Sequence, residues 1–569
     1  MDRNLLLAFA LSFLVLMLWT KLVAPPPKPA EESEEGQTVA TGEAAKPATE
    51  AGGVPLPAPE PGAEATGSLP EAALPEAALP ATVPAEPGQL LPEETSLYDA
   101  ELDSRGASIR HWELREYDAG PRGDYAPIVL TTGDPPYDRV LTTPFEELGI
   151  GNLSDAIFEV DEDVDSTVAF HLTKEGVTVR KVYRFQDGSY GFDLVVRVEN
   201  RSDHVIEPRF AVTWPAAARP GQDFTDQTLS VLEQGKLKKQ PLRSIWKRGF
   251  FRGAPQRVSD VMQDVDWAGV NMTYFVAAML PDNPAQARAR FVGTEPGRAG
   301  VVQVFFEPVR LPPGQVAERL FRAYMGPKEP KRLEAIGGGL PRAIDLGWSW
   351  VAPLTRGFGW LLAALYVIVH NYGVAIIVLT VLVRAVTAPL TNKQMRSMER
   401  MRALAPKLQE LKEKHGEDRQ KQSEEMMRLY RQEGVNPLGG CLPMVLQLPV
   451  FVGLFYALRS SIHLRHAPFV GWIDDLSAPE SLCVIPVLGV PLRVLPLVMG
   501  ATMFLQQRIT PTQQMDPAQQ KMMMTVMPIV MTVVFYRFPS GLVLYWMVSN
   551  LLAIAHQLWI GRRLRGKVA

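Results

Sequence analysis

Cysteine is almost missing from this chain of 569 residues, and the charges of opposite sign nearly balance. Cys441 and Cys483 are the only cysteines, which excludes a disulfide-stapled scaffold and a cysteine-rich zinc or iron–sulfur site. The formal net charge is -4, so bulk charge gives no reason to expect nucleic-acid binding. Apolar and charged residues are spread unevenly, which indicates several unlike regions.

Aromatic side chains are missing from residues 25–95. This stretch is rich in Pro, Ala, Glu and Gly, and it repeats the sequence EAALP at 71–75 and 76–80. Such a composition cannot bury enough apolar surface to offset the loss of chain entropy. We therefore predict a disordered, partly extended tether over residues 25–95.

Residues 1–24 contain an apolar run from Leu5 to Trp19, preceded by Arg3. With its flanks the run approaches the roughly 20 residues that span a bilayer. A cleaved signal peptide is the alternative, but it requires a small-residue cleavage site, and this run leads through Lys21 into three prolines. We predict an uncleaved signal-anchor helix, and both alternatives export the segment that follows.

Residues 96–326 show the alternation of apolar and polar residues that is typical of strands, for example over 192–199. Turn signals separate these runs, which predicts an exported all-β sandwich. Trp214, Trp246 and Trp267 either line a cleft or pack in the core, and we expect core packing. The acidic cluster at 161–165 lacks the spacing of a calcium loop and is expected to be a solvated turn.

Residues 344–569 have the pattern of a polytopic membrane domain. An aromatic-rich segment over 344–370 is expected to be an interfacial amphipathic helix. The second transmembrane helix is predicted at 371–390 and helices three to six within 438–560. These four runs are 438–458, 494–507, 522–536 and 542–559. The predicted fold class is a six-span α-helical membrane protein with a five-helix core and an exported all-β sandwich.

Basic residues are concentrated in two segments, 391–437 and the tail 561–569. Positively charged loops stay cytoplasmic. Both segments lie inside if the chain starts inside and crosses six times, which also exports the β domain. Cys441 is then near the cytoplasmic face and Cys483 outside, so the two cannot pair.

Segment 391–437 is predicted to be a helical hairpin. Leu404, Leu408 and Leu411 recur at near-helical spacing, and a break at His415 and Gly416 precedes a second helix. The charged hairpin is either a solvated connector or a docking surface for other components, and the sequence leaves both alternatives open.

The most informative residue is Arg384, because an arginine inside a span costs about 2.5–3.5 kcal/mol on insertion scales. Thr380, Arg384, Thr387 and Thr391 share one helical face. Gln447 in the third span and Tyr545 and Ser549 in the sixth add polar groups, while no acidic residue lies well inside a span. We expect a hydrated groove rather than an arginine that only reaches the headgroups.

Several motifs resemble those of the YidC family of membrane protein insertases. They are NYG at 371–373, VR at 383–384, PLT at 389–391, EMMRLY at 425–430, NPLGGC at 436–441, QLP at 447–449, FPSGLVLY at 538–545 and VSN at 548–550. The resemblance covers the whole chain in order, from the anchor through the exported domain to the five-helix core.

This resemblance implies an inner-membrane insertase and chaperone of a Gram-negative bacterium, working alone or with the Sec translocon. The family's groove arginine falls on Arg384 and its polar neighbours on Thr380 and Gln447. One aromatic position of the sixth helix, often Tyr in relatives, is Trp546 here, beside Tyr545. The expected partners are nascent membrane proteins, the Sec translocon, the lipid bilayer, and the ribosome or targeting machinery through the hairpin, with no nucleic-acid specificity.

Two other functions are possible from the sequence. A secondary transporter could use Arg384 to bind an anion, but it would need an internal repeat or a broken-helix pair. A membrane enzyme would need a base or nucleophile beside the groove. His463 and His466 have no third metal ligand nearby, and no Ser-His-Asp or paired-carboxylate set occurs. We expect no catalytic residues, no metal and no cofactor.

Overall fold

The structure is a computed structural model that describes residues 87–569 except 119, 121–125, 132–134, 165, 218–226, 247–255, 415, 417, 435–441, 486–488, 510–521 and 566–569. The predicted signal-anchor, most of the tether, His415, the NPLGGC motif with Cys441 and the end of the basic tail lie outside the described residues.

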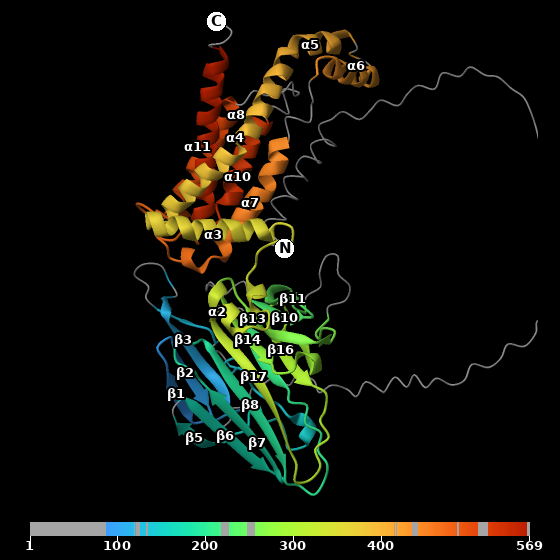
Figure 1. Cartoon of the computed structure of the whole chain (residues 1–569), viewed down its shortest axis with the longest axis vertical. Coiled ribbons are helices and arrows are strands. Elements are labelled where there is room, and N and C mark those ends of the chain that lie inside the picture. The colour runs from blue at the N-terminus through green and yellow to red at the C-terminus, as the bar shows by residue number, and fades with distance from the viewer. Residues whose placement is uncertain are drawn as a thin grey trace, which may run out of the picture. The chain divides into compact units, whose positions relative to one another are not determined.

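The exported domain is built from three antiparallel sheets (Figure 1). A nine-stranded sheet has the order β11-β10-β13-β14-β17-β8-β7-β6-β5. Its strands are β5 (Glu159–Val164), β6 (Thr167–Lys174), β7 (Val177–Arg184), β8 (Gly191–Asn200), β10 (Thr228–Glu233), β11 (Lys236–Pro241), β13 (Val265–Asn271), β14 (Phe275–Pro281) and β17 (Val316–Pro327).

Two four-stranded sheets accompany the large one. The first has the order β1-β2-β3-β4, with β1 (Leu90–Glu94), β2 (Tyr98–Asp103), β3 (Ser108–Asp118) and β4 (Pro127–Val129). The second has the order β12-β15-β16-β9, with β9 (Val212–Ala217), β12 (Met262–Gln263), β15 (Ala287–Glu295) and β16 (Ala299–Phe306).

The apolar face of each sheet contributes to one shared core. Trp112 of β3 stacks on Tyr98 of β2 at 3.8 Å between ring centroids and lies 5.2 Å from Phe192 of β8. Trp214 of β9 and Trp267 of β13 are buried in the same core. The alternation in the sequence therefore predicts the strands, and the expected core packing is correct for Trp214 and Trp267 but wrong for Trp246, which is half-buried and outside this core.

A short segment leads from β17 to the helical region through α2 (Pro330–Ile336) and a 3-10 turn (Leu340–Ala343). The helices that follow are α3 (Ala352–Val369), α4 (Tyr372–Ala403), α5 (Ala405–Lys414), α6 (Arg419–Gln432), α7 (Leu442–Ser460), α8 (Val494–Ile509), α10 (Met527–Phe535) and α11 (Ser540–Arg565). A π-helix (Met522–Val526) leads directly into α10. A small hairpin of β18 (Cys483–Ile485) and β19 (Val490–Leu492) precedes α8.

The helix α3 contacts α4 and α7 but runs across their ends rather than beside them (Figure 1). By length and composition, Ala352–Val369, Tyr372–Ser397 and Ser540–Ile560 are the described helices able to cross a membrane. The sequence predicts an interfacial helix over 344–370, and the observed helix occupies 352–369 of that range. The six crossings themselves remain a prediction.

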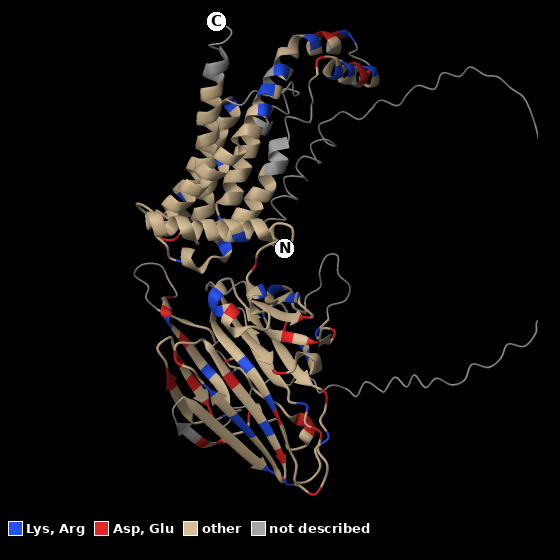
Figure 2. Ribbon diagram, in the orientation of Figure 1, with Lys and Arg blue, Asp and Glu red and all other residues tan. Residues whose placement is uncertain are grey.

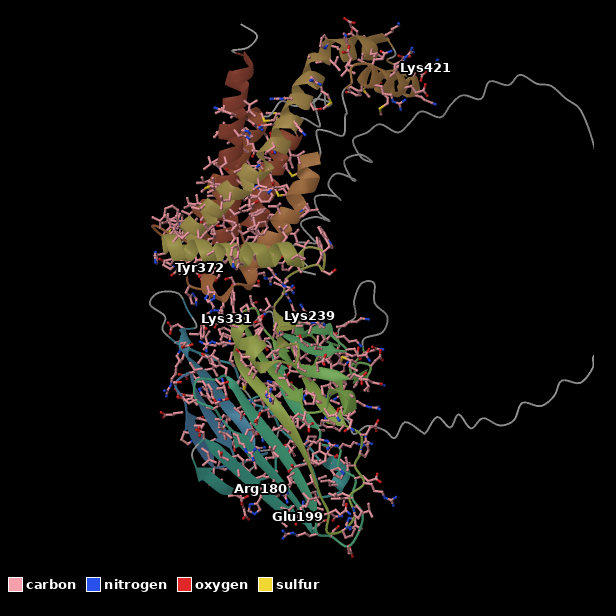
Figure 3. All side chains as sticks on the ribbon, viewed as in Figure 1. Arg180, Glu199, Lys239, Lys331, Tyr372 and Lys421 are labelled. Carbon is pink, nitrogen blue, oxygen red and sulfur yellow. The ribbon has the colours of Figure 1, made fainter. Side chains whose placement is uncertain are left out.

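The helix α4 continues beyond Leu390, where the second span is expected to end, as far as Ala403. The break comes at Leu404, and α5 begins at Ala405 with Pro406 in its first turn. Pro389 lies inside α4 without ending it, whereas Pro406 lies in the first turn of α5, where a missing N–H is tolerated. The charged hairpin therefore consists of α5 and α6, at the opposite end of α4 from Tyr372 (Figure 3).

Candidate functional site

The polar stripe of α4 consists largely of hydroxyl groups that bond to their own helix. Thr380 is buried and donates to the carbonyl oxygen of Ile376 at 2.6 Å, and Thr387 donates to that of Val383 at 2.9 Å. Such bonds to the preceding turn satisfy a hydroxyl hydrogen without a partner from another helix. Each hydroxyl oxygen can still accept a hydrogen bond, so the stripe is polar but carries few free donors.

Arg384 is the exception on this stripe, because its side chain reaches another helix. Its Nε and Nη2 atoms donate to Oγ of Ser549 on α11, at 3.0 and 2.5 Å. A guanidinium has five N–H donors and keeps its charge under all ordinary conditions. No ion pair to Arg384 occurs among the residues that the structure describes, and its hydrogen-bond partner there is a neutral hydroxyl.

A second polar contact links α7 to α11. The amide nitrogen of Gln447 donates to the hydroxyl of Tyr545 at 2.8 Å. Tyr545 is buried and lies four residues before Ser549, on the same face of α11. The side chains of Arg384, Gln447, Tyr545 and Ser549, which we call the polar cluster, therefore join α4, α7 and α11.

Asn550, next to Ser549, is buried, and its side-chain nitrogen has no hydrogen-bond partner among the described residues. An unpaired buried amide is costly in an apolar surrounding. The side-chain nitrogen of Asn550 is thus a polar group of the helical region that its described neighbours do not satisfy.

Trp546 lies outside the polar cluster, although the sequence places it in the candidate site. Its ring packs against Phe451 at 5.0 Å and Phe535 at 5.1 Å between centroids. Phe535 also stacks with Phe538 at 5.0 Å. Neighbouring residues on a helix point about 100° apart, so Trp546 faces an aromatic cluster of α7 and α10 while Tyr545 supplies the hydroxyl.

Two of the motifs that carry the resemblance hold helix ends in place. Asn371 accepts from the backbone N–H of Val374 at 3.0 Å and so caps α4. Gly373 leaves room for the ring of Phe469, which a Cβ atom would meet at 2.0 Å. At the start of α11, Ser540 donates through its hydroxyl to the carbonyl oxygen of Asp475 at 2.6 Å, and its N–H donates to that of Ala478 at 2.8 Å.

The charged hairpin has a small apolar core. Met401, Leu404 and Leu408 are buried against Met426, Leu429 and Tyr430. Outside this core the hairpin carries both signs of charge, in contrast to the nearly uncharged helices of the membrane region (Figure 2). Lys407 of α5 pairs with Glu433 at 2.7 Å, which ties the two arms together. This exposed pair stabilises little by itself, because water and salt screen it.

His463 and His466 do not form a metal site among the described residues, where no group of three potential ligands occurs. Nδ1 of His466 lies 2.9 Å from Oδ2 of Asp475 instead. Burial favours a raised pKa for Asp475, but hydrogen bonds from His466 and Ser477 outweigh it and lower the pKa. This pair supports the loop that Ser540 also contacts.

Sequence reasoning missed one residue of the loop between α7 and α8, Glu480. The carboxylate is buried, accepts from the indole N–H of Trp472 at 2.8 Å and caps α8 by accepting from the N–H of Leu495 at 2.7 Å. A lone acid just before a long apolar run is the signal that could have identified it, since carboxylates favour helix N-termini.

Comparison with known proteins matches nearly the whole described chain. Residues 93–361 match the YidC periplasmic domain and residues 364–567 match the family described as 60Kd inner membrane protein. A membrane protein insertase YidC from Syntrophus aciditrophicus (strain SB) is 35% identical over 590 residues, covering 99% of this chain and 100% of the relative. Another from Geobacter metallireducens is 34% identical over 574 residues, covering 99% and 98%.

A solved structure described as an active YidC insertase with the first transmembrane domain resolved is also similar to this chain. It is 17% identical and covers 83% of this chain and 94% of its own, with a TM-score of 0.34.

Proposed function

The chain belongs to the YidC family of membrane protein insertases, and from this premise we propose that its polar cluster receives the polar segments of nascent membrane proteins. The protein is a bacterial inner-membrane insertase with a periplasmic β domain, and it acts on membrane proteins in the lipid bilayer. The proposal adds the site of action, the topology and the further partners.

The observation that carries the proposal is the surrounding of Arg384. A permanent charge within an apolar helix is costly, and such residues usually face water, a partner or a pathway. The described partner of Arg384 is the hydroxyl of Ser549, which contributes no opposite charge. The guanidinium therefore keeps attraction for an acidic group that arrives from elsewhere.

We propose that the cluster lines a hydrated groove open to the cytoplasm and to lipid. Water in such a groove lowers the cost of moving a polar backbone across hydrocarbon. Arg384 attracts acidic residues of the incoming tail, because charges interact strongly where the dielectric constant is low. The apolar segment of the substrate then leaves sideways into lipid, between the third and fifth spans. No chemical step is needed, so the protein acts without enzymatic catalysis.

The proposed topology has six crossings with both termini in the cytoplasm. It is supported by the basic residues of 391–437 and of the tail, because positive loops stay inside. In this topology the hairpin of α5 and α6 is cytoplasmic, and we propose that it contacts the ribosome or targeting machinery. Cooperation with the Sec translocon belongs to the same proposal.

Removal of residues 407–425 tests the role of the hairpin. Insertion should fall while the helices of the membrane region still assemble, because the recruiting surface is lost. Unchanged insertion would show that the hairpin is only a connector.

Substitution of Arg384 tests the site. Insertion into liposomes should be measured for two substrates that differ only in the charge of the translocated tail, normalised to the amount of insertase. Arg384→Lys should retain more activity than Arg384→Ala, because a point charge remains. Arg384→Glu should be the most harmful variant for the acidic tail. Arg356→Ala, which removes an exposed arginine of α3, is the matched control and should have little effect.

The two-substrate design separates the explanations. Equal sensitivity of both substrates to Arg384→Ala would contradict the electrostatic role and leave the family assignment intact. A drop in insertase abundance for every substitution would indicate a structural arginine. An anion-coupled transporter, the alternative function, would require a small solute for activity, whereas an insertase in liposomes does not.

A further inference from the structure

The hairpin of β18 and β19 between α7 and α8 is apolar over its whole length. No charged residue occurs from Ser481 to Leu492. Cys483 pairs with Leu492 and Ile485 with Val490, and the N–H of Leu482 donates to the carbonyl oxygen of Leu492 at 2.9 Å. Residues 483–485 and 490–492 thus form a two-stranded antiparallel ribbon.

Both faces of the ribbon are exposed. Val484 is 57% exposed on one face, and Cys483 and Val490 are exposed on the other. A single two-stranded hairpin is marginally stable in water, and one that exposes apolar residues is a liability there. The composition of this ribbon therefore suits an apolar environment on both of its faces.

The base of the ribbon is held rigidly against the helices. Glu480, which precedes it, links Trp472 to the first turn of α8. Arg493, which follows it, lies over the ring of Tyr536 at 5.0 Å and donates to the Tyr536 carbonyl oxygen. The Tyr536 hydroxyl in turn donates to the carbonyl oxygen of Pro491. These contacts fix the direction in which the ribbon leaves the helical region.

The exposed apolar surface continues from the ribbon onto the helices. Leu497 and Val498 are exposed in the first turns of α8, and Ile529 and Val533 are exposed on α10, which contacts α8. Apolar side chains on the outside of membrane helices face lipid. Trp472, with its indole N–H bonded at the base of the ribbon and part of its ring exposed, has the amphipathic character of interfacial tryptophans.

We propose that the β18–β19 ribbon lies in the outer leaflet of the bilayer and anchors the loop between α7 and α8 to the lipid surface. The ribbon has two open edges, whose unpaired backbone groups cannot enter the dry hydrocarbon centre. Its depth is therefore the boundary between headgroups and acyl chains. This lipid-contact site goes beyond the insertase activity, and its leaflet follows from the topology proposed above.

Cys483 provides a natural reporter for the test. In Cys441→Ser protein, Cys483 is the single cysteine of the chain and can carry a nitroxide label in lipid nanodiscs. Collisions with oxygen, which concentrates in lipid, are compared with collisions with a water-soluble nickel chelate. Two reference labels, at Asp474→Cys in the same loop and at Val533→Cys on α10, are placed in protein that lacks both native cysteines.

The oxygen-to-nickel ratio at Cys483 should exceed that at position 474 several-fold and approach that at position 533. Val484→Asp should lower the ratio at Cys483 several-fold, because a carboxylate keeps the ribbon out of the lipid. A ratio at Cys483 equal to that at position 474 would overturn the proposal. Protection of Cys483 from both reagents would also overturn it, in favour of a protein partner such as a second copy or the nascent chain.

Discussion

The exported β domain and the helical region bury opposite kinds of side chain. In the β domain Trp112 is fully buried, and most charged residues are not buried. In the helical region Val386 is 81% and Trp360 73% exposed, whereas Thr380 and Ser549 are buried. The first pattern is that of a protein folded in water, and the second is that of one whose outer surface meets lipid.

A buried lysine of the β domain, Lys181, and the half-buried Arg384 of α4 differ in chemistry. Lys181 of β7 donates to the carbonyl oxygens of Leu141 and Gly106, at 2.7 and 3.2 Å. Burial lowers the pKa of Lys181 well below its ordinary value, so this lysine can lose its charge. An arginine cannot. Arg384 therefore keeps its charge, whereas Lys181 can lose its own.

The largest expected effect is the difference in stability loss between two Trp→Ala substitutions, one in each region. Trp112→Ala should destabilise the β domain by about 3–5 kcal/mol, because it leaves a cavity in a packed core. Trp360→Ala should destabilise the protein much less, because this side chain is exposed and its removal leaves no cavity. Denaturant unfolding of the full chain, followed by fluorescence, measures both. Similar losses for both variants would refute the contrast between the regions.

Sequence patterns predict the helices and strands of both regions better than they predict the contacts between these elements. Alternation over 192–199 predicts β8, and apolar length predicts the helices, because both signals are local. The order of the nine-stranded sheet depends on pairings far apart in the chain, such as β14 with β17, and no local signal encodes them. For the same reason the sequence groups Gln447, Tyr545 and Ser549 with Arg384 but does not predict which of them bond.

Two departures from expectation have identifiable causes. Trp546 is assigned to the site through an aromatic position of the family, but its direction on α11 takes it to Phe451 and Phe535. Helix α4 continues to Ala403, past Leu390 where the second span is expected to end, because hydropathy falls at Leu390 although helix propensity does not. Pro389 lies inside α4 and Pro406 lies in the first turn of α5, so the positions of prolines in the sequence do not show where α4 ends.

The next largest effect is a pH dependence confined to the β domain. Lys328 is buried, with Nζ donating to Oδ1 of Asn271 at 3.1 Å. Burial lowers its pKa to about 7, against the opposing effect of Asp345. Between that pH and the ordinary lysine pKa the unfolded chain binds one more proton than the folded one. Stability should therefore rise with pH in this window, by about 1.4 kcal/mol per pH unit.

Denaturant titrations of the full chain above neutral pH measure this slope. Lys328→Met should reduce it, whereas Lys331→Met, which removes an exposed lysine of α2 (Figure 3), should leave it in place. Below about pH 7 the part of the slope that is due to Lys328 should disappear, because this lysine is then protonated in both the folded and the unfolded state. An unchanged slope in Lys328→Met would assign the effect to another group.

A smaller effect is expected in the helical region. Ser549→Ala removes the hydroxyl that faces Arg384 and should cost about 0.6–1.7 kcal/mol, the range found for hydrogen bonds between membrane helices. Ser460→Ala is the matched control, since this serine bonds to the carbonyl oxygen of Tyr456 in its own helix. Insertion of the acidic-tailed substrate should change in Ser549→Ala only. Equal effects of the two variants would show that the Arg384–Ser549 contact has no special role.

The smallest effect is expected from the largest change, deletion of residues 100–320. This removes most of the β domain but keeps α3 and the helices that carry the polar cluster. The exported domain has its own apolar core, and the cluster draws Arg384, Gln447, Tyr545 and Ser549 from α4, α7 and α11 alone. Insertion per molecule in liposomes should therefore remain largely intact. A stably expressed, correctly oriented deletion variant that inserts nothing would show that insertion requires the β domain as well as the helical region.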